Sequence, residues 1–143
     1  MTEHTERSLV LIKPDGFRRG LTGEVLRRVE AKGYGLLALT VTEARPEQLA
    51  AHYAEHEGKP FFGPLLDFMS SGPLTAAVIE GHGCIPGFRA LAGATDPTAA
   101  LPGTIRGDLG RDWGEAVQQN IVHGSDSPES ADREIGIWFP HLG

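Results

Sequence analysis

A chain of 143 residues, 40% of them hydrophobic and 22% charged, has the composition of a globular domain and enough apolar side chains for one sizeable core. Its formal net charge of −6 disfavours nucleic acid and anionic membranes as partners, and its one cysteine, Cys84, excludes an internal disulfide or a cysteine-built zinc site. We therefore expect a single domain over residues 1–143. A cytoplasmic location is expected because the polar Met1–Arg7 segment does not resemble a signal peptide, and no stretch approaches the roughly 20 apolar residues of a membrane helix.

The N-terminal part of the chain alternates apolar runs with turn signals. Leu9-Val10-Leu11-Ile12 is continuously apolar and predicts a central strand buried on both faces, followed by a turn cluster at Lys13-Pro14-Asp15-Gly16. Apolar residues at helical spacing over residues 21–29 predict a helix that ends near Gly33. Residues 35–42 predict a second strand.

The middle of the chain predicts further helices around a third strand. Pro46 is placed to begin a helix that Gly58 closes, and a short helix is expected over residues 61–69. Residues 75–80 predict the third strand, and residues 86–91 predict a short helix after it.

The C-terminal part begins with a long irregular segment. Over residues 93–114 periodicity is lost and Gly, Pro and Asp are frequent, which predicts a loop of a length that is usually functional. Residues 121–123 predict a brief strand. Ser127-Pro128-Glu129 predicts a helix start, and we expect that helix to contain Glu134 and to end at Gly136.

The order of these elements indicates the fold class. Strands interleaved with helices in so short a chain predict an α+β fold, with one sheet and helices packed on it. A ferredoxin-like βαββαβ arrangement with an antiparallel sheet fits this order.

The first candidate catalytic residue is His123, which follows a predicted strand in the segment Asn120-Ile121-Val122-His123-Gly124-Ser125-Asp126. A neutral imidazole is a competent nucleophile towards phosphorus when a partner holds the proton on its second nitrogen. Glu134, on the next helix, is a candidate for that partner. Ser125 is a candidate to hydrogen-bond a bound nucleotide or the surroundings of His123. The alternative for an isolated histidine in such a setting is a polar turn without function.

The segment Pro102-Gly103-Thr104-Ile105-Arg106-Gly107-Asp108 places an arginine between glycines, where the backbone can bend sharply and a ligand can approach closely. Arg89 and Thr95 are candidates to converge on the same anion. Lys13 directly follows a buried strand, where functional groups often lie. Together these groups would stabilise the charge of a phosphoryl group in transfer, although each cation taken singly is more often a solvated surface charge.

Other signals are weaker or missing. The sequence contains no GxxxxGK[ST] motif, which excludes a P-loop kinase. Tyr53 and Phe61 flank Gly58-Lys59-Pro60, where an aromatic ring can form one wall of a slot for a base, although core packing is the commoner role. His52 and His56 are spaced to bind a metal from one helix, but without a third ligand we expect a solvated helix face.

These segments resemble, in order, those of the nucleoside diphosphate kinase family, and the segment around His123 resembles the family's active-site signature. The other matching segments are Leu11–Gly16, His52-Tyr53, Pro60–Phe62, Ser71–Pro73, Pro102–Asp108 and Glu134–Phe139. The resemblance extends from about Arg7 to Phe139, which is nearly the whole chain.

The resemblance implies a ferredoxin-like fold and a reaction. In that reaction the γ-phosphoryl group of a nucleoside triphosphate, typically ATP, passes to a nucleoside diphosphate by a ping-pong mechanism through a phosphohistidine on His123. It also implies that Glu134 holds the His123 ring and that Tyr53 lies close to it. The implied nucleotide contacts are Arg89, Thr95 and Arg106 on the phosphates, Lys13 and Asn120 on the sugar, and Phe61 and Val117 on the base.

The resemblance also bears on specificity, metal and assembly. Stacking without contacts to base edges implies broad base tolerance. Mg²⁺ is expected to arrive bridging the nucleotide phosphates, with no metal site of the protein's own. A homo-oligomer is expected, a hexamer or alternatively a tetramer. Residues 108–117 form a longer segment than the resemblance leads us to expect, which bears on Val117 and brings in Trp113 as a further candidate to reach the nucleotide or another subunit.

Two other functions agree less well with the sequence. An inactive relative that only binds nucleotides is disfavoured because the candidate nucleophile and the residues around it are all present. A nucleic-acid-binding module on a ferredoxin-like sheet is disfavoured by the net charge of −6 and by the absence of an aromatic RNA-binding signature in the sequence.

Overall fold

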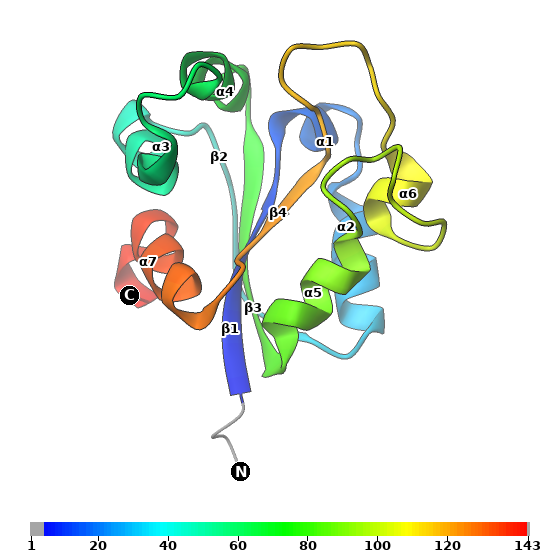
Figure 1. Cartoon of the computed structure of the whole chain (residues 1–143). Helices are drawn as coiled ribbons and strands as arrows, with labels where there is room; N and C mark the ends of the chain where they lie inside the picture. Colours follow the sequence, from blue (N-terminus) through cyan, green and yellow to red (C-terminus); the bar gives the residue numbers. More distant parts are fainter. Residues whose placement is uncertain (1–4, 143) are drawn as a thin grey trace.

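A four-stranded antiparallel sheet lies at the centre of the computed structural model, which describes residues 5–142 (Figure 1). Its strands are β1 (Thr5–Ile12), β2 (Gly35–Thr42), β3 (Leu74–His82) and β4 (Val122–Gly124), in the spatial order β2-β3-β1-β4. Strand β1 pairs with β3 and β4, and β2 pairs with β3, always antiparallel. With helices between β1 and β2 and between β3 and β4, the sheet has the βαββαβ topology that the sequence predicts.

Helices cover both faces of this sheet. One face carries α3 (Pro46–His52), α4 (Phe62–Met69) and α7 (Pro128–Trp138), at the left in Figure 1. The other face carries α1 (Pro14–Arg18), α2 (Thr22–Ala31), α5 (Cys84–Ala92) and α6 (Ile105–Leu109). Short 3₁₀ turns, Ala54–His56 and Pro140–Leu142, follow α3 and α7. None of the helices within residues 5–142 has the length and apolar character that a bilayer crossing demands.

Strand β1 explains why the run Leu9–Ile12 has no polar face. Leu9 and Leu11 point into the core shared with α3, α4 and α7, whereas Val10 and Ile12 point into the core shared with α2 and α5. All four side chains are fully buried, and each contributes roughly 1.5–3 kcal/mol to folding by leaving water. The prediction of a central strand buried on both faces is confirmed.

Two stretches predicted as irregular are helical. The turn cluster at residues 13–16 is the beginning of α1, because Pro14 occupies the first helical position. The loop predicted over residues 93–114 contains α6, whose first turn is capped when the Thr104 Oγ1 accepts a hydrogen bond from the Gly107 N–H at 2.9 Å. Neither helix has the length at which hydrophobic periodicity becomes visible.

The end of α7 also differs from the prediction. The helix does not stop at Gly136 but continues to Trp138, and the Phe139 N–H still donates to the Ile135 carbonyl at 2.7 Å. Ile135 and Trp138 are buried against the sheet, so their packing outweighs the roughly 1 kcal/mol by which an interior glycine weakens a helix.

Strand β2 is an edge of the sheet and carries an exposed apolar row. Leu37, Leu39 and Val41 alternate along it and are 42%, 48% and 56% exposed. An edge strand with a row of exposed apolar side chains is a surface suited to pairing with another protein chain.

Candidate active site

A cavity of about 680 Å³, here called the main cavity, opens between β4, α5 and the segment that connects α5 to α6. Its polar lining consists of Lys13, Arg89, Thr95, Thr104, Arg106, Asn120 and His123. None of the described residues that line it carries a carboxylate, so three cationic side chains face the cavity without an acidic neighbour on its wall. Such a cavity suits an anion of several charges.

An unusual backbone conformation at Ile121 shapes one wall of the main cavity. Ile121 has φ +73°, and the Val122 N–H donates to the Asn120 carbonyl at 2.8 Å, which is the pattern of a γ-turn. A β-branched residue in this region stores about 1–3 kcal/mol of strain. Two contacts hold it: the Ile121 N–H donates to Asp15 Oδ2 at 3.1 Å, and its carbonyl accepts from the Lys13 N–H at 2.7 Å.

The γ-turn brings Asn120 to Lys13. Lys13 Nζ donates to Asn120 Oδ1 at 2.8 Å, and Asn120 Nδ2 donates to the Thr95 carbonyl at 2.9 Å. Burial, together with the nearby positive charge of Arg106, lowers the pKa of Lys13 to about 8. Lys13 therefore presents a positive charge to the main cavity below about pH 8.

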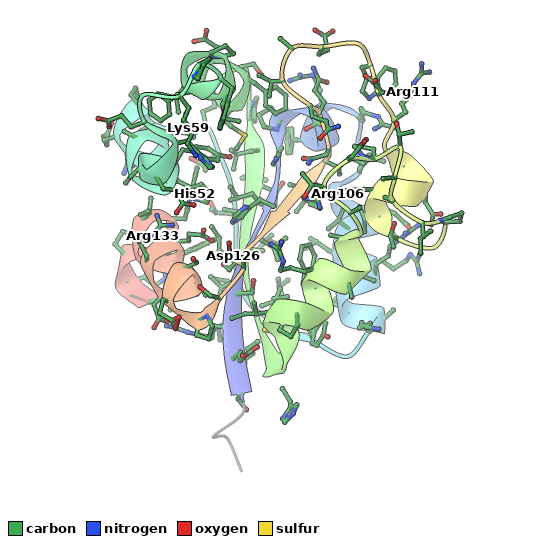
Figure 2. All side chains as sticks on the ribbon, viewed as in Figure 1. His52, Lys59, Arg106, Arg111, Asp126 and Arg133 are labelled. Atoms are coloured by element: carbon green, nitrogen blue, oxygen red, sulfur yellow. The ribbon has the colours of Figure 1, made fainter. Side chains whose placement is uncertain are left out.

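Arg106 is fixed by backbone carbonyls that it reaches from α6 (Figure 2). Its Nη2 donates to the Val122 carbonyl at 2.7 Å, its Nη1 to the Gly93 carbonyl at 2.9 Å and its Nε to the Asn120 carbonyl at 3.1 Å. Burial, and then the charge of Arg89, lowers the pKa of Arg106 to about 10, so the guanidinium stays charged at neutral pH. The guanidinium is thus held rigid beside the main cavity.

Arg89 has more freedom than Arg106. It projects from α5, its side chain is exposed, and its Nη1 makes one long hydrogen bond, 3.4 Å, to the Gly124 carbonyl. Arg89 also lines the main cavity, so its side chain can adjust to a bound anion, whereas the Arg106 guanidinium is held in one position.

His123 is held from behind by Glu134. The His123 Nε2 lies 2.9 Å from Glu134 Oε1, and the Ser125 hydroxyl donates to the same oxygen at 2.7 Å. A carboxylate can only accept these bonds, so Nε2 carries the proton and donates, and Nδ1 keeps its lone pair. Since His123 also lines the main cavity, an unprotonated ring nitrogen stands beside the cationic pocket.

Glu134 remains ionised although it is almost fully buried. Burial alone would raise the pKa of this carboxyl, but the hydrogen bonds that it accepts from His123 and Ser125 lower it. Ser125 is fully buried and also accepts a hydrogen bond from the Leu9 N–H at 3.0 Å, so it supports Glu134 and does not reach the main cavity.

The structure brings most of the predicted site residues together. Lys13, Arg89, Thr95, Arg106, Asn120 and His123 line the main cavity. Tyr53 lines a smaller cavity of about 170 Å³ on which His123, Arg89 and Glu134 also border. Its hydroxyl is buried and unpartnered among the described residues, and burial and then the charge of Glu134 raise its pKa.

The two candidates for the base lie outside both cavities. Phe61 is 45% exposed, with the His56 ring 5.3 Å away and the Lys59 ammonium over its face at 5.9 Å. Val117 lines a separate cavity of about 240 Å³, formed by residues 112, 113 and 115–119. In the same segment Trp113 is 44% exposed, and the guanidinium groups of Arg19 and Arg111 lie over its ring.

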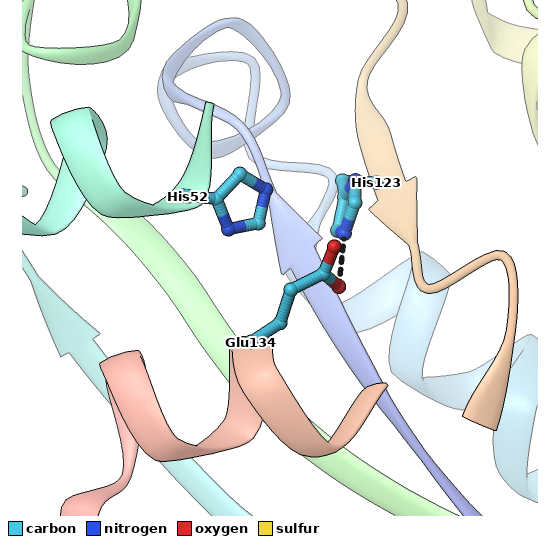
Figure 3. Close-up of side chains that lie close together, drawn as sticks. All are labelled: His52, His123 and Glu134. Carbon is cyan, nitrogen blue, oxygen red and sulfur yellow. Dashed lines mark hydrogen bonds and ion pairs between the residues drawn. The ribbon is translucent and has the colours of Figure 1, made fainter. Parts of the chain in front are cut away.

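The prediction of a solvated helix face for His52 was wrong. His52 is 4% exposed and lies against His123, with ring centroids 4.6 Å apart (Figure 3). It is also within reach of Glu134, since one possible metal-ligating atom from each of the three residues lies within 4.8 Å of the others. No local pattern predicts this burial, because Trp138, which packs on His52, lies on the distant helix α7.

The chain resembles known proteins in sequence and in fold. A sequence model of nucleoside diphosphate kinases matches residues 6–142. The chain belongs to the nucleoside diphosphate kinase family. Relatives include the nucleoside diphosphate kinases of Mycolicibacterium gilvum, 59% identical, and Saccharopolyspora erythraea, 58% identical. Each alignment covers 96% of this chain and 99% of the relative.

Solved nucleoside diphosphate kinases share the fold. A family protein from Babesia bovis superimposes with a TM-score of 0.89 at 44% identity, over 96% of this chain and 90% of that one. A halophilic nucleoside diphosphate kinase from Halobacterium salinarum, solved in complex with CDP, superimposes with a TM-score of 0.88 at 45% identity, over 95% of this chain and 88% of that one. The ferredoxin-like α+β prediction is thereby confirmed.

Nucleoside diphosphate kinases catalyse phosphoryl transfer between nucleotides, so this chain is a nucleotide-binding phosphotransferase. Nucleotide kinases of this kind generally use a divalent metal ion. The anion-binding character of the main cavity agrees with the family's substrates, which carry two or three phosphate groups.

Proposed function

We propose that this nucleoside diphosphate kinase transfers the γ-phosphoryl group through a phosphohistidine formed on Nδ1 of His123. The observation that carries this proposal is the hydrogen bond of 2.9 Å between His123 Nε2 and Glu134 Oε1. It fixes the proton on the nitrogen that faces α7 and leaves the other nitrogen as the only nucleophilic atom of the ring.

In the first transfer, one bond to the γ-phosphorus forms and one breaks. The Nδ1 lone pair of His123 forms the bond to the γ-phosphorus while the bond to the bridging oxygen breaks, and that oxygen leaves with the electron pair as part of the nucleoside diphosphate. The ring gains positive charge and keeps its Nε2 proton, which Glu134 stabilises. A second nucleoside diphosphate then attacks the same phosphorus with a terminal phosphate oxygen, and the lone pair returns to Nδ1.

The walls of the main cavity are suited to the charges of this reaction. We propose that Arg89, Arg106 and Thr95 hold the phosphates, and that Lys13 and Asn120 bind the sugar hydroxyls; all five line the main cavity, and Lys13 is hydrogen-bonded to Asn120. Fixed cations beside a transferring phosphoryl group lower the barrier without reorganising during the reaction.

Mg²⁺ is proposed to enter with the nucleotide. Hard divalent cations prefer oxygen ligands, and the described lining of the main cavity supplies cations and neutral groups but no carboxylate. The nucleotide's own phosphate oxygens would therefore hold the ion, and the nucleotide–Mg²⁺ complex would be the substrate.

The base is proposed to lie at the open end of the site. Phe61, whose ring is about half exposed, would stack on it, and Val117 would form the opposite wall. Stacking uses the faces of a base and not its edges, so we expect broad base tolerance. The CDP bound by the Halobacterium salinarum relative supports a nucleoside diphosphate as a ligand of this site.

The chain is further proposed to act as a homo-oligomer in the cytoplasm, a hexamer or alternatively a tetramer. The exposed apolar row of Leu37, Leu39 and Val41 on edge strand β2 supports a contact between two copies, because burying it would remove apolar surface from water and pair the free strand edge.

A labelling experiment tests the phosphohistidine. Incubation with γ-labelled ATP should place an acid-labile, alkali-stable label on the protein, and addition of GDP should move that label to GTP. His123→Ala should abolish both steps, whereas His141→Ala, the same change at an exposed histidine that lines neither cavity, should preserve them. Label transfer to GTP by a folded His123→Ala variant would contradict the proposal, and a wild-type chain that binds ADP but takes no label would be an inactive relative.

A further inference from the structure

His52 is held between the buried Trp138 side chain and the His123 ring. Its Nδ1 accepts a hydrogen bond from Trp138 Nε1 at 3.1 Å, and its ring meets the His123 ring edge to face, with an interplanar angle of 70°. In Figure 3 the edge of the His52 ring that carries Nε2 is turned towards His123. These two contacts fix the His52 ring in an orientation that can affect His123.

The Trp138 contact determines which nitrogen of His52 carries the proton. An indole N–H can only donate, so Nδ1 of His52 must be the acceptor and the proton must sit on Nε2. Burial lowers the pKa of His52 to about 3, so the ring stays neutral in this tautomer at physiological pH.

This tautomer decides between two roles for the cluster of His52, His123 and Glu134. The three residues are close enough to suggest a metal site. A metal bound at His52 Nε2 would require the proton to move to Nδ1, where it would face the Trp138 N–H, and two donors would then oppose each other. The His52 Nε2 therefore carries a proton and does not serve as a metal ligand.

We propose that His52 is a positioning residue for the phosphoryl transfer: its Nε2–H, directed at the face of the His123 ring, holds that ring against Glu134 and opposes the positive charge that the ring gains when phosphorylated. This inference rests on the phosphohistidine mechanism proposed above. An N–H group pointed at a neutral aromatic face is weakly attracted to it. The same group pointed at a cationic ring meets charge of its own sign.

As a consequence of this contact, the phosphohistidine on His123 remains reactive. Glu134 stabilises the charged His123 ring by accepting the hydrogen bond from His123 Nε2–H. His52 opposes that charge with its own Nε2–H at the face of the ring, so the phosphoenzyme does not become a stable end state. The other charged groups that line the two cavities with His123 are Lys13, Arg89 and Arg106 in the main cavity, and Glu55, Asp126 and Arg133 in the smaller one. They are the same in every variant of His52 and cancel in a comparison.

Two substitutions of His52 separate this role from simple packing. His52→Gln places an amide N–H near the position of Nε2 but gives up the acceptor for Trp138. His52→Asn keeps an acceptor near the position of Nδ1 but gives up the N–H that faces His123. His141→Asn makes the same change at an exposed histidine on the 3₁₀ turn that follows α7, which lines neither cavity, and is the control.

The measurement is the fraction of phosphoenzyme at equilibrium. Each folded variant is mixed with ATP and ADP at a fixed ratio, quenched in alkali and analysed by intact-protein mass spectrometry. We expect His52→Asn to raise the ratio of phosphorylated to free enzyme by about threefold, and His52→Gln and His141→Asn to leave it near the wild-type value. A ratio that falls or stays unchanged in His52→Asn would overturn the proposal, because a packing defect would weaken the phosphoenzyme.

A second measurement needs no variant of His52. In ¹⁵N NMR spectra of the wild-type protein, we expect the His52 ring in the Nε2–H tautomer, with that ring remaining neutral well below pH 5. An Nδ1–H tautomer, or a ring that is protonated by pH 5, would end the proposal even if His52→Asn fails to fold. A wild-type chain without phosphate on His123 would instead overturn the proposed function, while the tautomer of His52 would still be read from the same spectra.

Discussion

Replacing Glu134 by Gln removes a charge from the active site while keeping its shape. In the wild type, Glu134 Oε1 accepts from His123 Nε2 at 2.9 Å and from the Ser125 hydroxyl at 2.7 Å, and the side chain is only 5% exposed. The Gln oxygen can accept both bonds, but a hydrogen bond to an ionised group contributes about 1.5–3 kcal/mol and one between neutral groups about 0.5–1.5 kcal/mol. The ring becomes charged only during transfer, so the difference of about 1–2 kcal/mol should appear in the transition state.

We therefore expect Glu134→Gln to lower kcat by about fivefold to thirtyfold. ADP affinity should change little, because Glu134 does not line the main cavity. Rapid-quench measurement of phosphoenzyme formation gives the rate of the chemical step, and calorimetric titration with ADP gives the affinity. Arg133→Gln is the matched control: Arg133 Nη2 lies 3.7 Å from Glu134 Oε2 and the side chain is 43% exposed, so its loss should leave the rate close to the wild-type value.

Two results would refute this reasoning. Turnover of Glu134→Gln at the wild-type rate would mean that the carboxylate charge does not assist the transfer. A loss confined to ADP affinity would mean that Glu134 acts on nucleotide binding, contrary to its place behind His123. Thermal unfolding of the variant excludes a general loss of structure, since a buried neutral amide should not destabilise the fold as an unpaired charge would.

Further changes test other parts of the structure. The Lys13 ammonium is lost as pH rises through its lowered pKa of about 8, so we expect the KM for nucleotides to rise above that pH and Lys13→Gln to remove this dependence; a wild-type KM that is flat to pH 9.5 would contradict it. In Gly16→Ala the new Cβ would lie 2.9 Å from Cγ2 of both Ile12 and Ile121, so we expect a loss of about 1–3 kcal/mol in urea unfolding together with reduced activity, and an unchanged midpoint would speak against strain at the γ-turn. Leu39→Asp should lower the particle mass in analytical ultracentrifugation while the protomer stays folded, and an unchanged mass would remove β2 from the subunit contact.

The sequence predicts best where the signal is local. The run Leu9–Ile12 is apolar without alternation because its strand is covered on both faces, and this pattern alone indicated a central strand with Lys13 at its end. The cap and proline at Ser127-Pro128 likewise marked the start of α7. The family resemblance then paired His123 with Glu134, and the structure places these two side chains in contact.

The sequence predicts least where a residue depends on a distant partner. His52 is buried by Trp138, 86 positions later in the chain, and nothing in the local pattern distinguishes it from a solvated helix histidine. Ile121 adopts a conformation against its own preference because Asp15, 106 positions earlier, accepts its N–H. Val117 rests on resemblance alone and Phe61 on resemblance and its place beside Gly58-Lys59-Pro60, and their contact with a base stays a prediction.

The atom that receives the phosphoryl group is the most direct test of the mechanism. Protein labelled with ¹⁵N-histidine can be phosphorylated with ATP, and the coupling between ³¹P and ¹⁵N then identifies the bonded nitrogen. We expect phosphorus on Nδ1 of His123, with the proton retained on Nε2 towards Glu134. Phosphorus on Nε2, or on any other residue, would contradict the role of the hydrogen bond between His123 and Glu134.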